Sequence, residues 1–138
     1  MNKIIFAIIV MLSSQVFAEK VEDMQVTGEK IDREGIRKTF LDHQKDLMGC
    51  YNKALANAKK KTKETGKESQ SLAGKMTLDF TIDEDGSVMY MQMDSGRSNL
   101  KDMGVAGCII KQGYSWIFPK PPKGQTVQVF YPLAFSPK

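Results

Sequence analysis

Residues Gly74–Asp94 predict a β-hairpin, a unit that needs the rest of the chain to cover one of its faces. The first half alternates apolar and polar residues, with the apolar ones at Met76, Leu78, Phe80 and Ile82. A period of two is typical of a strand with one buried face. Asp83–Gly86 supplies turn residues, because Gly86 can adopt a positive φ without steric cost. A second β-like run, Val88–Met93, completes the hairpin.

The second strand of this hairpin can be arranged in two ways. Val88 starts in phase with a buried face, but Met91 and Met93 have the opposite parity. A β-bulge near Met89 and Tyr90 would return both methionines to the core side. Without a bulge, Met89, Met91 and Met93 share one face. Both arrangements remain open.

The first eighteen residues resemble a secretory signal peptide. Lys3 precedes an apolar run, Ile4–Leu12, which is short for a bilayer span, and Val16–Ala18 fits a cleavage point after Ala18. No cysteine stands there to carry a lipid, and a retained membrane anchor is the alternative. We therefore expect a periplasmic protein without a stable membrane anchor.

Charge and cysteine content agree with export. Lys3 is the one charged residue in 1–18, so cleavage lowers the net charge from +4 to +3, too small an excess to indicate a nucleic-acid partner. Cys50 and Cys108 remain. In an oxidising compartment they are expected to form one disulfide, worth about 4 kcal/mol in the chain-entropy model. Two free buried thiols are the alternative.

A long amphipathic helix is expected before the hairpin, over Arg33–Lys59. Asp32 suits its N-cap, and its apolar side is formed by Ile36, Phe40, His43, Leu47, Cys50, Tyr51, Ala54 and Ala58. Lys59–Ser71 has no apolar periodicity and predicts a loop. That loop is either a solvated basic surface or a contact for anionic headgroups or polymers.

A second helix and a last strand follow the hairpin. Ser98 or Asn99 can cap the helix, whose expected inner side is Leu100, Met103, Gly107 and Ile110. Val127–Phe135 alternates strictly and predicts a strand. Pro132 lacks a backbone donor, which indicates an edge position or the outer side of that strand.

These elements predict a two-layer α+β domain. Both helices would cover one face of a three- or four-stranded, mainly antiparallel sheet, and the disulfide would join the helices. The chain divides into a signal peptide (1–18), an N-terminal segment (19–31) with a brief edge strand near Met24–Gly28, and one domain (32–138).

An ordered set of short motifs resembles the AgmX/PglI C-terminal domain family, itself similar to the C-terminal domains of TonB and TolA. The matching residues are His43, Cys50-Tyr51, Leu55, Gly74-Lys75-Met76, Phe80-Thr81-Ile82, Asp85-Gly86-Ser87-Val88, Cys108, Trp116-Ile117-Phe118-Pro119, Pro122, Gly124 and Tyr131-Pro132-Leu133-Ala134-Phe135. The resemblance covers roughly Met24 to the C terminus. It implies a TonB-like fold and a non-enzymatic periplasmic role, without cofactor, in gliding-motility or envelope-spanning machinery.

This chain differs from such relatives, which carry a membrane anchor and a long linker, and so we expect a free-standing adaptor that binds envelope proteins. Binding would use a sheet edge, either Val127–Phe135 with Phe130, Tyr131 and Pro132, or the short N-terminal segment. The same edge could pair with a second copy to give a homodimer.

Chemical sites are weakly marked in the sequence. His43, the single histidine, has no partner for catalysis or metal binding, and we expect it to be buried and bonded to backbone or to Tyr51. Asp83–Gly86 contains part of a calcium-loop pattern, but turn chemistry explains it. The alternative function is periplasmic Cu(I) binding by the thioethers of Met89, Met91 and Met93.

Overall fold

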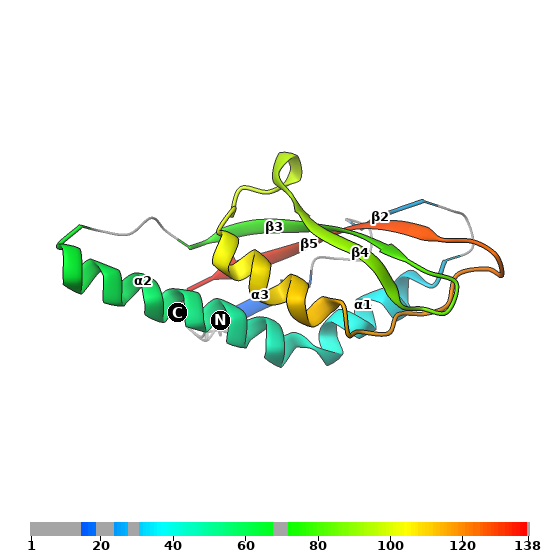
Figure 1. The fold of residues 1–138 in the computed structure, drawn as a ribbon, viewed down its shortest axis with the longest axis horizontal. Helices are drawn as coiled ribbons and strands as arrows, with labels where there is room; N and C mark the ends of the chain where they lie inside the picture. The colour runs from blue at the N-terminus through cyan, green and yellow to red at the C-terminus, as the bar shows by residue number, and fades with distance from the viewer. Residues whose placement is uncertain (1–14, 19–23, 28–30, 68–71, 138) are drawn as a thin grey trace, which may run out of the picture.

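The structure, a computed structural model, describes residues 15–18, 24–27, 31–67 and 72–137. It is an α+β fold in two layers, as expected, with the helices together on one face of an antiparallel sheet (Figure 1). The helices are α1 (Arg33–Asp42), α2 (Gln44–Thr65) and α3 (Met103–Gly113). The strands are β1 (Gln15–Ala18), β2 (Gln25–Val26), β3 (Gly74–Ile82), β4 (Val88–Asp94) and β5 (Val127–Ser136).

The sheet has the order β1-β5-β3-β4, and β2 also pairs with β5. β5 is therefore internal, and the prediction that Val127–Phe135 is an edge was wrong. On one side, β5 pairs with β3 from Gly74↔Phe135 to Ile82↔Val127. On the other side, β1 covers Leu133–Ser136 and β2 covers Val129 and Phe130. The sequence did not predict β1, whereas β2 lies within the brief edge strand expected near Met24–Gly28.

Pro132 is accommodated inside this internal strand because of the direction in which its backbone nitrogen points. The N–H of Thr77, which lies opposite Pro132, donates to Ser98 Oγ at 2.9 Å on the β4 side. In an antiparallel pair of strands, two directly opposed residues either both point their backbone N–H and C=O groups toward the other strand or both point them away from it. The backbone nitrogen of Pro132 therefore faces away from β3, between the stretches paired by β1 and β2.

The long N-terminal helix is divided at His43 and extends further than expected. His43 has φ −105° and ψ 13°, and its N–H is shared between the carbonyls of Thr39 and Phe40 at 3.3 and 3.2 Å. Past Lys59, where a loop was expected, α2 continues to Thr65 and ends at Gly66 in the left-handed conformation. Residues 60–65 are rich in lysine and contain a glutamate, and both residue types favour a helix even without an apolar stripe, which explains this error.

The second helix begins later than predicted. Its N-cap is Asp102, whose carboxylate accepts from the Val105 N–H at 2.9 Å. Ser98 and Asn99 instead bind the start of β3: Ser98 Oγ accepts from Thr77 and Asn99 Oδ1 accepts from the Lys75 N–H. The inner face also differs from the expected one and consists of Val105, Ala106, Ile109 and Gly113. Met103 and Gly107 are exposed.

A β-bulge resolves the second hairpin strand. Ile82 pairs with Val88, whereas Thr81 pairs with Tyr90, so Met89 is the extra residue. Met91 then lies opposite Phe80 and is buried. The bulged arrangement predicted as one of two possibilities is the correct one.

Aromatic rings join the two layers at the centre of the core. Phe40 of α1 stacks on Tyr131 of β5 with 3.8 Å between ring centroids, and meets Trp116 edge-on at 5.4 Å. Phe80 and Phe118 complete this cluster around Phe40. Burial of large aromatic side chains supplies much of the packing energy of a domain of this size.

Candidate functional site

One border of the sheet is β4, which pairs with β3 alone among the described strands. The opposite border is formed by the two short strands β1 and β2, each of which pairs with β5 alone. The Met91 N–H points outward from the sheet and donates to the Tyr114 hydroxyl at 3.2 Å. Because backbone directions alternate along a strand, the groups of Met93 also point outward. β4 therefore presents backbone donors and acceptors that a further strand can use.

Exposed apolar side chains gather beside this border. Four of the six large exposed hydrophobic residues in the described ranges surround the first half of β4, and we call them the β4 patch: Met89, Tyr90, Tyr114 and Ile117. Their exposed fractions are 55%, 42%, 48% and 66%. Large apolar side chains that are exposed next to an open strand border are typical of interaction sites.

The hairpin turn holds Ile117 against the start of β4. Ser87 forms a β-bridge with Ile117, and the Phe118 N–H donates to the Gly86 carbonyl at 2.8 Å. Gly86 has φ 88°, and a Cβ there would lie 2.4 Å from the Phe118 carbonyl oxygen. Asp85 Oδ1 accepts from both the N–H and the hydroxyl of Ser87, and the hydroxyl bond in particular lowers the Asp85 pKa. The expected turn chemistry of Asp83–Gly86 is thus present.

The residues predicted to bind a partner lie elsewhere. Tyr131 is buried against Phe40, and Pro132 is buried as well. Phe130 is partly buried on the opposite face of the sheet, where the Arg97 guanidinium lies 4.0 Å from its ring centroid. With β2 paired along Phe130, these residues are not a free edge.

The methionines considered as copper ligands do not converge. Met89 is largely exposed at the bulge, whereas Met91 is 3% exposed, with its sulfur packed against Gly113. Met93 is partly buried. The bulge that places Met91 in the core therefore separates it from Met89. The described residues also hold no group of three or more His, Cys, Asp or Glu side chains arranged for a metal ion.

His43 occupies a structural position. Its Nδ1 lies 2.8 Å from the Thr39 carbonyl oxygen, so Nδ1 carries a proton, and its ring stacks on Trp116 with centroids 4.6 Å apart. The bond to backbone was one of the two expected for His43, but the residue is partly exposed rather than buried, because it lies at the junction of α1 and α2. Tyr51 instead donates its hydroxyl to the Leu72 carbonyl, and burial raises its pKa.

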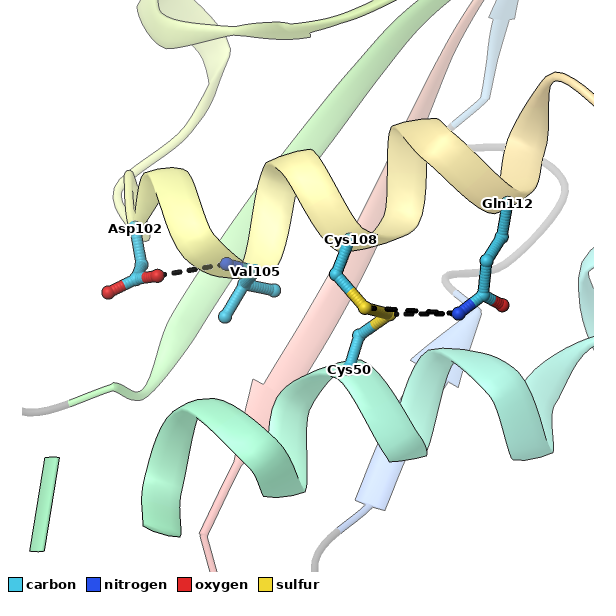
Figure 2. Close-up of a disulfide and its surroundings, with 5 residues drawn as sticks. All are labelled: Cys50, Asp102, Val105, Cys108 and Gln112. Carbon is cyan, nitrogen blue, oxygen red and sulfur yellow. Dashed lines mark hydrogen bonds between the residues drawn. A yellow bond between two sulfur atoms is a disulfide. The ribbon is translucent and has the colours of Figure 1, made fainter. Parts of the chain in front are cut away.

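Cys50 and Cys108 form the expected disulfide, which joins α2 to α3 with 5.7 Å between the Cα atoms (Figure 2). Gln112 Nε2 donates to Cys50 Sγ at 3.3 Å on one side of the bond. On the other side, the helices diverge into a groove of about 830 Å³. Sequence reasoning did not find this groove, because its second wall depends on the late start of α3 and on how that segment packs beside α2.

Sequence reasoning also missed Tyr114 and Ile117. Ile117 stands between buried Trp116 and Phe118, and this alternation was the available signal for an outward side chain. Tyr114 directly follows α3, and only the tertiary structure brings it to β4.

Comparisons with family models, with curated proteins and with solved structures found no match for this chain. No helix in the described ranges combines the length and the apolar character needed to cross a membrane. Residues 1–14, which include most of the predicted signal peptide, lie outside the described residues.

Proposed function

We propose that this chain is an exported, non-catalytic adaptor of the bacterial cell envelope that binds an extended segment of a partner protein along β4. The observation that carries the proposal is the β4 patch beside an unpaired strand border. Strand addition uses these two features together, because main-chain hydrogen bonds supply affinity and neighbouring side chains supply specificity.

Export is supported by the signal-like segment 1–18 and by the disulfide, which persists in oxidising compartments. The resemblance to the AgmX/PglI C-terminal domain supports a periplasmic place in a gliding-motility-type or other envelope-spanning system. The partner is then an envelope protein. A second copy paired through the same border, as a homodimer, is the alternative occupant.

Photo-crosslinking in cells tests the proposal. A photoreactive residue replaces Tyr90 in one strain and Leu41, an exposed apolar residue of α1, in a matched control strain. We expect position 90 to give a discrete product with an envelope protein that position 41 does not give. A product composed of two copies of this chain would identify the homodimer instead. Identical products from both positions would contradict binding at β4.

Hydrogen exchange on the purified complex tests the mode of binding. Strand addition is expected to protect the outward amide of Met93 and to release Met91 from Tyr114. Tyr90→Glu should lower the affinity for the partner at least tenfold. Leu41→Glu, which adds the same charge elsewhere, should change that affinity less than twofold. A stable complex with an unprotected Met93 amide would refute strand addition.

A further inference from the structure

The groove beside the disulfide has one continuous wall on α2. Its lining residues there recur at intervals of three and four, so that they share one helical face: Cys50, Lys53, Ala54, Asn57, Ala58 and Lys61. The opposite wall is formed by residues 99–104, which contain the segment before α3 and its first turn, together with Cys108, and Leu72 also lines the groove. This groove shares no residue with the β4 patch.

The groove is basic. Lys53 and Lys61 come from α2 and Lys101 from the facing segment, and all three are exposed. One acidic residue, Asp102, also lines it, and its carboxylate already accepts from the Val105 N–H at the start of α3 (Figure 2). Three positive charges against one negative charge favour an anionic ligand. The N-terminus of α3, which carries partial positive charge, adds to this preference.

The length of the groove favours a linear ligand. From Cys50 to Lys61, α2 rises about 16 Å at about 1.5 Å per residue. An extended peptide advances about 3.3 Å per residue, so about five residues span the groove. Apolar surface from Ala54, Ala58 and Leu72 lies beside the amides of Asn57 and Asn99, which can bond a peptide backbone.

We infer that this groove binds an acidic peptide segment of a partner protein in extended conformation. The lysines pair with its carboxylates, and the apolar strip between Ala54 and Leu72 receives an apolar side chain. This is a second binding site, independent of β4, so that the adaptor can hold two segments at once.

Fluorescence anisotropy with labelled peptides tests the inference. The probe is the blocked peptide Glu-Leu-Glu-Ala-Glu, and the charge-reversed control is Lys-Leu-Lys-Ala-Lys. We expect saturable binding of the acidic peptide only. Lys53→Glu/Lys61→Glu should weaken it at least tenfold. Lys59→Glu/Lys63→Glu, on the opposite side of the same helix, makes the same charge change outside the groove and should weaken it less than threefold.

Amide chemical shifts locate the bound peptide. Resonances of Ala54, Ala58 and Gly104 should move on titration, while those of β4 stay in place, so that failure at the groove is distinguishable from failure at β4. Equal weakening by the two double variants would overturn the inference, since it would mean general charge attraction. Full displacement of the peptide by stoichiometric inorganic pyrophosphate would also overturn it in favour of a small-anion site.

Discussion

Gly86 is the residue on which the position of the β4 patch depends. A side chain there would both require a strained positive φ and collide with the Phe118 carbonyl. We expect Gly86→Ala to lower the free energy of unfolding by about 2–4 kcal/mol, as the sum of left-handed strain and overpacking. Gly66 has a similar φ of 68°, but the space where a Cβ would lie is open. Gly66→Ala should therefore lower the free energy of unfolding by only about 1 kcal/mol. Urea unfolding of both variants measures the difference, and equal losses would contradict the collision.

Asp94 is expected to make stability depend on pH. The Arg97 side chain donates to its carboxylate at 2.6 Å, and this bond in particular lowers the pKa of Asp94 below its ordinary value of 3.8. A carboxylate with a lowered folded-state pKa stabilises the fold above its unfolded-state pKa, and this contribution is lost as the pH falls through the folded-state value. The free energy of unfolding should therefore fall on acidification below about pH 4.

Asp94→Asn and Arg97→Gln test this dependence from its two sides. Each removes the charged bond, so each should flatten the acid part of the curve of unfolding free energy against pH. Urea unfolding at a series of pH values provides the curve. Acid dependence that is unchanged in both variants would show that other carboxylates are responsible.

At the scale of the elements, the disulfide links α2 and α3 across a sequence separation of 58 residues. In the chain-entropy model, a disulfide that closes a loop of this length stabilises the folded state by about 4 kcal/mol. Cys50→Ser/Cys108→Ser should lose about that much stability in denaturant unfolding. The oxidised protein should approach the same value when reductant is added. A loss below about 1 kcal/mol would mean that contacts between the helices suffice without the bond.

The elements differ in how far the sequence predicts them. The hairpin was predictable because its alternation and its turn residues agree, and the disulfide because the chain has two cysteines and a segment that resembles a secretory signal peptide. The extension of α2 past Lys59 was not, since propensity rather than apolar periodicity maintains it. β5 was predicted as a strand but not as an internal one, because its outer neighbours are two short segments with weak patterns.

The sequence predicted the type of candidate site but not its position in the fold. A sheet border was expected, but the border at β4 depends on which strands pair with β5, and strand order is a long-range property. The arrangement that would place Met89, Met91 and Met93 on one face differs from the observed one by a single inserted residue, Met89, and the sequence pattern allowed both arrangements. In the α2–α3 groove, the α2 wall lies mostly within the predicted helix, whereas residues 99–104 of the other wall were expected to be the start of the second helix.

At the scale of the whole molecule, removal of residues 1–18 should alter one side of the sheet. β1 lies entirely within the predicted signal peptide and pairs with Leu133–Ser136. A chain that begins at Glu19 should show faster hydrogen exchange than the full-length chain at the Ala134 and Ser136 amides, which face β1, but not at the Leu133 and Phe135 amides, which face β3. The amides of β3, between β4 and β5, should exchange equally slowly in both. Equal protection of the Ala134 and Ser136 amides in the two forms would contradict a stable β1.

The pairing of β1 links the proposed cleavage to assembly. With residues 15–18 in place, Leu133–Ser136 is paired with β1, and β1 itself forms that border of the sheet. If the chain is cut after Ala18, that border passes to β5, where Ala134 and Ser136 present backbone groups that a partner strand can pair with. Cleavage would then exchange a neighbour from the same chain for one from another molecule.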